Sequence, residues 1–459
     1  MTAPLSYADS AFRIISRRLL PMFLIGQMLM NIDRSSISYA ALQINETLGI
    51  SAEMFGLAAG IFFVGYSIFE VPSNLALQRV GATKWIGAIV FGWGVVTTLQ
   101  AFVPNAETLI ALRFLMGVFE GGFTPGVIFT ITLWLPSAQR GRALALTLLA
   151  VPLAGMIGGP LAGLLLGMRW LGLDGWQWLF IMCGGATIVF ALVWTRVVPT
   201  GPQEAKWLPV PERDALLQTL DLERKAQTLD PHSSASFLHA IKTWPVWVYS
   251  VAYLGICVGY FGIFFWLPQI IQKGFASLSP LENGLLAAIP FVIAMITMTV
   301  LGRTQDKSGD RRWHLAALGV VSGLALVLSL LISSHVVAFA ALCVAVACAL
   351  TYIALFWASP MSVLSATAAA GGIALINSIG NLGGFLGPYL TGILAGDAHE
   401  FGRATVFFAG MLLVAGVVPI VFRSLFPSLG QIAQRAELAL RGSGDGAQPA
   451  AHPVSGEAR

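Results

Sequence analysis

Charged residues are scarce in this chain of 459 residues, of which Asp, Glu, Lys and Arg together make up 10%. An average soluble protein has about 25%, and a soluble globule could not cover its surface with so few charges. Disordered chains contain few aromatic residues, whereas this chain has 28 Phe and 13 Trp, which excludes a disordered chain. With 56% hydrophobic residues, the chain is predicted to fold in a lipid bilayer.

Cysteine is rare as well, and the common catalytic motifs are absent. Cys183, Cys257, Cys343 and Cys348 lie in apolar runs without CxxC spacing or a neighbouring His cluster, which predicts buried thiols and neither a disulfide framework nor a metal site. The sequence contains no HExxH, GxSxG or phosphate-binding GxxxxGKS/T motif. We therefore expect no enzymatic activity and no cofactor, with an ion gradient as the energy source.

Long hydrophobic runs dominate what is present. A bilayer core of about 30 Å needs roughly 20 apolar residues per helix, and polar or Gly/Pro breaks divide the chain into twelve such runs. The prediction is an all-α membrane protein of twelve transmembrane helices. The predicted spans are 19–42, 54–77, 85–103, 107–135, 143–167, 178–198, 244–271, 281–301, 315–332, 336–357, 367–395 and 405–426.

The runs form two sets of six around a hydrophilic connector. The predicted parts are an N-terminus (1–18), a first six-helix bundle (19–199), the connector (200–242), a second six-helix bundle (243–428) and a disordered polar tail (429–459). The turns PSNLALQRVGATK and GRTQDKSGDRR are similar and occupy corresponding places in the two sets. An internal repeat with a binding site at its interface is typical of secondary transporters.

Basic residues gather on one side of this topology. The other side has only Arg169, Lys273 and Arg403. The positive-inside rule then places both termini in the cytoplasm, so we expect a multi-pass protein of the cell (inner) membrane.

Five charged residues lie in the interior of predicted spans, more than three residues from either end, and all five are in the first half: Asp33, Arg34, Glu70, Arg113 and Glu120. An ionised side chain at a helix centre costs about 2.5–3.5 kcal/mol on insertion scales, so each requires a reason. Arg113 and Glu120 are seven residues apart and share a helix face, whereas adjacent residues diverge by about 100°. If Asp33 and Glu120 faced Arg34 and Arg113 across one cavity, the set would be neutral.

Two interpretations of this set are open. A static ion-pair network could lock the helices together, although buried pairs are poor sources of stability. Alternatively, guanidinium groups could bind an anion in a polar cavity, and a buried acid, whose neutral form desolvation favours, could carry a proton. We favour the cavity, with Arg34 and Arg113 binding substrate and Asp33 or Glu120 carrying protons.

Aromatic and amide residues could complete the site. The candidates are Tyr66, Tyr253, Tyr260, Trp357, Asn377 and Asn381. Single aromatic residues in spans more often pack helices or form an interface belt. Asn377 and Asn381 are four residues apart and share a helix face. Two roles are equally compatible with this spacing: hydrogen bonding to another helix, or contact with the substrate.

The turn GRTQDKSGDRR also predicts a gate. Asp306 can pair with Arg311 or Arg312 and cap neighbouring helix ends, which would hold one conformation closed. Topology-setting charge alone would explain the basic residues but not Asp306. We assign Glu70 and Arg79, at the corresponding turn of the first half, to the same gate.

Several motifs carry a family resemblance. In order, they are NIDRSSISYA, FGLAAGIFFVGYSIFEVPSNLALQRVGATKWIG, LRFLMGVFEGGFTPG, WLPSAQRGRA, GWQWLF and INSIGNLGGFLGPYLTG. Over residues 19–428 the chain resembles the anion:cation symporter branch of the major facilitator superfamily. The resemblance implies two six-helix bundles that rock around a central cavity, and proton-coupled import of organic anions such as tartrate, sugar acids, phthalate or hydroxyphenylacetate.

The resemblance also implies roles for individual residues. Proton-coupling positions fall on Asp33 and Glu120, and the substrate-side positions are Arg34, Tyr66, Arg113, Trp357 and Asn377. The chain departs from the pattern at Gln78, where the wider superfamily has an acid, and at Cys183. It also has Ala354 and Phe356 where sugar-acid transporters offer hydroxyl groups, which favours a smaller or aromatic acid.

The sequence therefore predicts a monomeric proton symporter that imports an organic carboxylate, with protons, a small organic acid and the lipid bilayer as partners and no nucleic acid. An antiporter or exporter that uses the same cavity is the alternative. A membrane sensor that binds without transport is a third hypothesis, disfavoured because the chain has only a short polar tail in place of a signalling domain.

Overall fold

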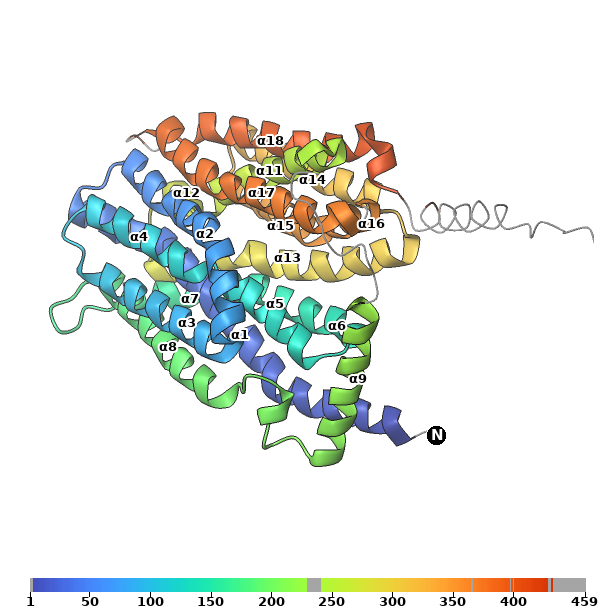
Figure 1. Ribbon diagram of the computed structural model, residues 1–459. Helices are drawn as coiled ribbons and strands as arrows, with labels where there is room; N and C mark the ends of the chain where they lie inside the picture. The colour runs from blue at the N-terminus through green and yellow to red at the C-terminus, as the bar shows by residue number, and fades with distance from the viewer. Residues whose placement is uncertain are drawn as a thin grey trace, which may run out of the picture.

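The computed structural model describes residues 3–228, 241–364, 366–396, 398, 400–427 and 431, and these are almost entirely helical (Figure 1). The first half contains α1 (Ala3–Leu48), α2 (Ala52–Val80), α3 (Ala82–Leu99), α4 (Ala106–Glu120), α5 (Phe123–Trp134), α6 (Ser137–Leu148), α7 (Ala150–Leu166) and α8 (Gly175–Val197). The second half contains α11 (Trp244–Phe264), α12 (Leu267–Gly274), α13 (Pro280–Ser308), α14 (Arg311–Leu331), α15 (His335–Phe356), α16 (Ala358–Val363), α17 (Ala366–Ala395) and α18 (Gly402–Val421). Between them lies α9 (Val210–Thr228).

Ten helical stretches of the described chain are long and apolar enough to cross a membrane. Three of these stretches join two consecutive α-helices, namely α4 with α5, α6 with α7, and α15 with α16, and a fourth, Ala82–Phe102, joins α3 to a short 3-10 helix. Helices α1 and α17, of 46 and 30 residues, also exceed the roughly 20 residues that a bilayer requires. Together these are the twelve predicted spans, six in each half, and the predicted fold class is confirmed.

Polar residues at the breaks begin the helices. The side chain of Ser51 accepts a hydrogen bond from the backbone N–H of Met54 at the start of α2 (3.2 Å). Ser279 and Glu282 form a capping box at the start of α13. These bonds satisfy N–H groups that have no partner within the helix, which explains why the spans begin at the polar breaks.

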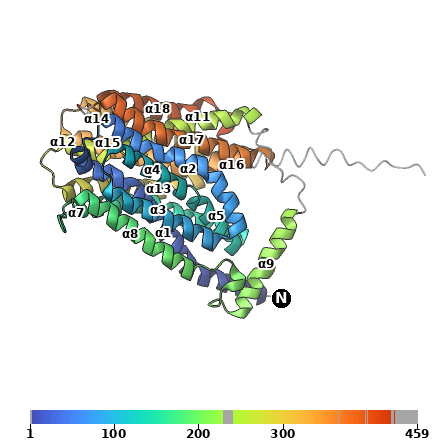
Figure 2. The same ribbon diagram turned by 60° about the vertical axis from the view of Figure 1, so that its left-hand side comes forward.

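The two halves pack side by side, and α9 lies outside them against α1, near the N-terminus (Figures 1 and 2). Across the interface α2 packs against α17 and α7 packs against α13. We call the side that carries the N-terminal end of α1 the terminal face and the opposite side the distal face. Because the spans alternate in direction, α2 and α13 begin at the distal face, and α7 and α17 end there.

The close approaches between the halves lie in the distal half of the bundle. A Cβ atom on Gly56 of α2 would meet the carbonyl oxygen of Pro388 in α17, and one on Gly159 of α7 would meet that of Gly284 in α13. The absence of side chains at these positions lets the backbones touch. The halves are therefore closed against each other at the distal face.

The connector, predicted to stay outside the membrane, carries α9 and holds it to the first half. Both carboxylate oxygens of Glu223 accept hydrogen bonds from the backbone N–H of Ser137 (2.9 and 3.1 Å), and Arg140 donates to Oε2 (3.2 Å). This carboxylate accepts hydrogen bonds at the N-terminus of α6, where backbone N–H groups have no partner within the helix and the helix dipole favours a negative charge. Residues 229–240 of the connector and the predicted tail, apart from Gln431, lie outside the described residues, and the predicted domain boundaries stay predictions.

Candidate functional site

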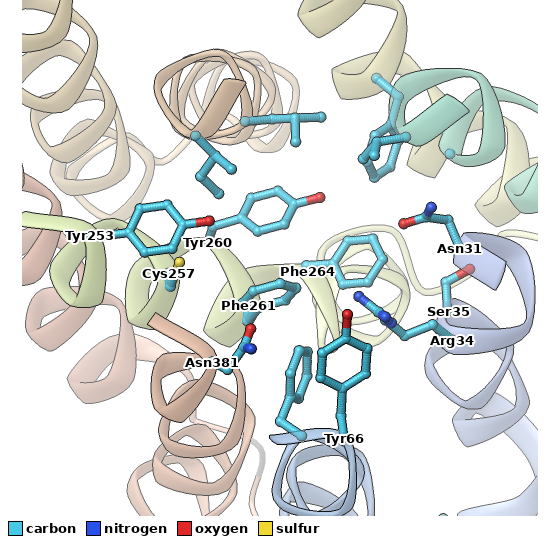
Figure 3. A pocket seen from close by; sticks show the side chains of 16 residues that line it. Asn31, Arg34, Ser35, Tyr66, Tyr253, Cys257, Tyr260, Phe261, Phe264 and Asn381 are labelled. Atoms are coloured by element: carbon cyan, nitrogen blue, oxygen red, sulfur yellow. The ribbon is translucent and has the colours of Figure 1, made fainter. Parts of the chain in front are cut away.

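A cavity of about 190 Å³ lies between the two halves. It is smaller than the roughly 300–1,000 Å³ of pockets for drug-sized ligands, so it suits a small molecule. The residues that line it are Asn31, Arg34, Ser35, Phe63, Tyr66, Val151, Gly155, Tyr253, Cys257, Tyr260, Phe261, Phe264, Phe291, Leu350, Ile353 and Asn381. Figure 3 shows Arg34 projecting into the cavity from α1 and Tyr66 rising towards it from α2.

Arg34 is the cationic group of the cavity. Its Nε donates a hydrogen bond to Oε1 of Glu120 (2.9 Å), and its Nη2 forms an ion pair with the same oxygen. The guanidinium carbon lies 4.8 Å from the ring centroid of Phe62 and 5.5 Å from that of Tyr66, within the range of cation–π attraction. The guanidinium is thus held by a carboxylate on one side and by aromatic rings on another while it still reaches the cavity.

Glu120 lies behind Arg34 and outside the cavity lining. It is the last residue of α4, its side chain is fully buried, and its Oε2 has no hydrogen-bond partner among the described residues. The pair Gly121 and Gly122 follows, and a Cβ on Gly121 would meet the carbonyl oxygen of Tyr66 in α2. The break between α4 and α5 therefore brings α2 and the carboxylate close to Arg34.

Arg113 does not line the cavity. It is fully buried, and it donates from Nε to the carbonyl oxygen of Ala58 (3.3 Å) and from Nη2 to that of Arg34 (3.5 Å). Its Nη1 lies 3.3 Å from the sulfur of Met116. The structure thus places Arg113 between α4, α2 and α1, where it contacts the backbone next to the cavity-facing arginine.

Asp33 points away from Arg34, into the first half. Its Oδ2 accepts hydrogen bonds from Nε1 of Trp93 in α3 (2.5 Å) and from Oγ1 of Thr187 in α8 (2.7 Å). The other oxygen, Oδ1, is buried and has no partner within the described part of the chain. Of the four charges expected around one cavity, only Arg34 reaches its wall. Asp33 does not reach it, because adjacent side chains on α1 face different helices.

The second half contributes Tyr253 and Asn381 to the lining. The ring of Tyr253 stacks on Phe356 (4.9 Å between centroids) and packs edge-on against Trp357 (4.8 Å). Trp357 therefore supports a lining residue without lining the cavity itself. Asn377 lies one turn before Asn381 on α17 and is also outside the lining.

The predicted gate residues lie towards the terminal face and are not joined to one another. Asp306 is exposed, and no ion pair links it to Arg311 or Arg312 in the described structure. Arg311 instead donates to the carbonyl oxygen of Ala358 (2.9 Å), and Arg312 stacks on Trp313. The capping carboxylate at the start of α14 is that of Asp310, whose Oδ1 accepts from the N–H of Trp313 (3.2 Å).

In the first half, Glu70 is half-buried near the terminal end of α2, and Arg79 is exposed one residue before that helix ends. Asp306 was expected to pair with Arg311 or Arg312 and to cap a neighbouring helix end. In the described structure Asp310 makes the cap instead. The reason is local: Asp310 directly precedes α14 and reaches its free N–H groups, whereas Asp306 lies within α13.

Sequence reasoning missed several lining residues. Asn31 and Ser35 line the cavity and, being four residues apart, share one face of α1. Helical spacing from Arg34 indicates Asn31, three residues before it, but not Ser35, which is adjacent to Arg34 and diverges from it by about 100°. Cys257 is a buried thiol, as predicted, and it also lines the cavity, which was not predicted. Phe261 and Phe264 carry no signal in a span where most residues are apolar. In the described residues, no group of three His, Cys, Asp or Glu side chains could hold a metal ion.

Comparison with known proteins agrees with this architecture. Residues 23–388 match the model of the Major Facilitator Superfamily, which is about four-fifths of the chain. The chain belongs to this superfamily of membrane transporters, and it is a multi-pass membrane transporter and not an enzyme.

Individual relatives are similar to this chain over most of its length. The chain is 38% identical to an Agrobacterium vitis protein named "Putative tartrate transporter", over 91% of this chain and 96% of that protein. It is 36% identical to the "Quinolone resistance transporter" of Acinetobacter baumannii, over 90% and 95% of the two chains. A solved bacterial homologue of the human lysosomal transporter Spinster, in an inward-facing and unoccupied conformation, shares the fold with a TM-score of 0.71 at 17% identity, covering 92% of this chain and 98% of that chain.

Proposed function

We propose that this protein imports an organic carboxylate together with one or more protons across the inner membrane, with both termini in the cytoplasm. One observation carries the proposal: among the described residues, Arg34 is the one whose guanidinium lines the cavity, and it does so while paired with the buried carboxylate of Glu120. The relative named for tartrate transport supports an organic anion as the substrate. Under this proposal the terminal face is cytoplasmic, and the distal face, where the halves are closed against each other, lies on the opposite side of the membrane.

The coupling follows from competition for Arg34. While Glu120 is ionised, it neutralises the guanidinium and weakens the attraction for an anion in the cavity. When Glu120 takes up a proton, the ion pair is lost, and Arg34 can form charge-assisted hydrogen bonds with a substrate carboxylate. Proton and substrate then favour each other's binding, which is what thermodynamic coupling requires.

Release reverses these steps on the cytoplasmic side. Once the cavity opens there, Glu120 loses its proton to water and its carboxylate displaces the substrate from Arg34. The observed ion pair is the state expected after release. Asp33, with its unpaired Oδ1, is the second proposed proton site, and Arg113 positions Arg34 through the backbone contact.

The remaining predicted residues have proposed roles around this centre. Tyr66, Tyr253 and Asn381 contact the substrate from the lining, with Trp357 behind Tyr253 and Asn377 one turn away. Charges near the terminal face would meet when the halves close there, and these are Glu70, Arg79, Asp306, Arg311 and Arg312. Their separation in the present structure fits a conformation in which that gate is open.

Proteoliposomes test the proposal directly. Adding substrate outside weakly buffered vesicles should raise the external pH, because protons enter with the carboxylate. Vesicles without protein provide the control. Substrate entry with no change in external pH would contradict proton coupling.

Export by proton antiport is the second candidate, and the relative named for quinolone resistance favours it. In that case substrate entry expels protons, so the same experiment lowers the external pH. A sensor would bind the substrate with saturation but show no counterflow of labelled substrate. The sign of the pH change and the presence of counterflow therefore separate the three hypotheses.

A further inference from the structure

In the part of the chain that the structure describes, one charged residue lines the cavity. Among the residues that line it, Arg34 is the only one with an ionisable Asp, Glu, Lys or Arg side chain. Arg113, which the sequence predicts as a second cation for the substrate, is fully buried behind the lining and donates to backbone carbonyl groups. The cavity can therefore neutralise one negative charge on a bound molecule.

Aromatic rings form much of the remaining wall. Tyr260 stacks with Phe264 (5.5 Å between ring centroids), and Phe264 packs edge-on against Phe291 (6.0 Å). From the other half, Phe63 lies 4.7 Å from Phe261. Such rings pack well against a flat ring in offset or edge-on geometry, but they offer a second carboxylate no partner.

Neutral polar groups lie at both ends of this aromatic section. Figure 3 shows Arg34, Asn31 and Ser35 at one side of the cavity and Tyr253, Cys257 and Asn381 at the opposite side. The amide nitrogen of Asn381 is buried and has no hydrogen-bond partner among the described residues. The end opposite Arg34 thus carries neutral polar side chains and, among the described residues, no charged one.

We infer that the substrate is an aromatic monocarboxylate with a neutral hydrogen-bonding group on the side of the ring opposite the carboxylate. The carboxylate would bind Arg34, the ring would lie between the aromatic side chains, and the neutral group would meet Asn381. A dicarboxylate such as tartrate would place its second charge where no cation lies, and a buried unpaired charge is strongly unfavourable. This inference rests on the proposed carboxylate transport and specifies its substrate class.

The test is a binding comparison with the purified full-length protein, by isothermal titration calorimetry at pH 7. The reference probe is 4-hydroxybenzoate. Terephthalate has the same ring with a second carboxylate, benzoate lacks the neutral group, 4-hydroxybenzyl alcohol lacks the charge, and tartrate is an aliphatic dicarboxylate. We expect 4-hydroxybenzoate to bind about tenfold or more tightly than each of the other four, the size of effect that one lost polar interaction in a buried site produces.

The outcomes separate this inference from the proposed function. Tighter binding of tartrate or terephthalate than of 4-hydroxybenzoate would overturn the inference and leave carboxylate transport standing. Equal binding of the alcohol and 4-hydroxybenzoate would contradict the carboxylate function itself. Equal binding of benzoate and 4-hydroxybenzoate would remove the neutral group from the inferred class.

Substitutions at the far end give a second test. Asn381→Ala should abolish the preference for 4-hydroxybenzoate over benzoate, and Asn381→Lys should tighten terephthalate binding by about tenfold because it supplies the missing cation. Ser378→Ala, at an exposed position of the same helix, is the matched control and should leave both ratios unchanged. If Asn381→Lys bound terephthalate no better than the wild type does, the assignment of this end would be wrong.

Discussion

The guanidinium of Arg34 on α1 and the carboxylate of Glu120 on α4 form an ion pair in which the arginine faces the cavity and the acid does not. The two partners therefore differ in what they can reach. Arg34 is available to an anion in the cavity, whereas Glu120 acts on that anion only through Arg34. Substitutions of the two residues should therefore have different effects on binding and on coupling.

Replacing Glu120 with Gln should separate binding from coupling. Without an ionised competitor, Arg34 should bind a carboxylate about tenfold more tightly at alkaline pH. In the wild type the affinity should fall as the pH rises, because ionised Glu120 competes for Arg34, and in Glu120→Gln this dependence should flatten. Calorimetry across a pH series measures both effects, and uptake in proteoliposomes should show counterflow without accumulation.

Glu107→Gln is the matched control for that experiment. Glu107 lies in the first turn of the same helix and is exposed, so its neutralisation should change neither affinity nor accumulation. Accumulation against a gradient by Glu120→Gln would show that the proton is carried elsewhere, with Asp33 the next position to test.

Replacing Arg34 should weaken substrate binding directly. Arg34→Gln removes the only cation of the described cavity lining and leaves the buried Glu120 unpaired, so we expect the dissociation constant of a carboxylate to rise by about 30-fold or more. Arg34→Lys keeps the charge but loses the planar guanidinium that can bind a carboxylate through two hydrogen bonds. Its dissociation constant should lie between those of Arg34→Gln and the wild type. Arg169→Gln, at an exposed position, should bind normally, and an unaltered affinity in Arg34→Gln would exclude Arg34 from the site.

A methyl group at Gly284 should disturb closure at the distal face. The Cβ of Gly284→Ala would meet the carbonyl oxygen of Gly159 across the interface between the halves. We expect α7 and α13 to separate there, which spin labels at exposed positions 164 and 285 should report as a longer distance. Gly185→Ala is the control, because a Cβ there meets nothing within 4 Å, and unchanged distances in Gly284→Ala would show that this contact does not control closure.

Removing the hydroxyl that binds Asp33 should destabilise the first half. Thr187→Val loses the 2.7 Å hydrogen bond to Oδ2 and leaves Trp93 as the remaining donor to that oxygen in the described structure. The loss of a hydrogen bond to a buried carboxylate costs about 1.5–3 kcal/mol, so the thermal midpoint of the purified protein should fall. Thr195→Val, at an exposed position of the same helix, should leave it unchanged, and equal midpoints for the two variants would contradict the role of this bond.

The position of Asp33 illustrates how far the sequence could predict the site. A carboxylate in the middle of a span is conspicuous in the sequence because of its cost in lipid. Its partners are not, since Trp93 and Thr187 are ordinary residues of spans 60 and 154 positions away. The sequence thus marked the residue as important but could not say that it faces α3 and α8 and not the cavity.

For Arg113, too, the sequence predicts the helix face but not what that face contacts. Its spacing from Glu120 correctly puts both residues on one face of α4, and both are buried. Whether that face meets the cavity or another helix depends on how α4 is rotated against α2, which the close contacts of Gly117 and Gly121 with the backbone of α2 determine. Glycine spacing alone does not reveal which helix it will contact.

The amino-acid sequence alone is enough to establish the bilayer as the solvent, the twelve spans, the division into two halves and the residues whose charges are costly. These properties follow from composition and from the length of apolar runs, which act locally along the chain. Three-dimensional packing, in contrast, determines that Arg34 is the one charged residue among the described residues lining the cavity, that Glu120 pairs with it from outside the lining, and that aromatic side chains form much of the remaining wall. Partner choice depends on helix rotation and depth, and these arise from packing between residues far apart in the chain.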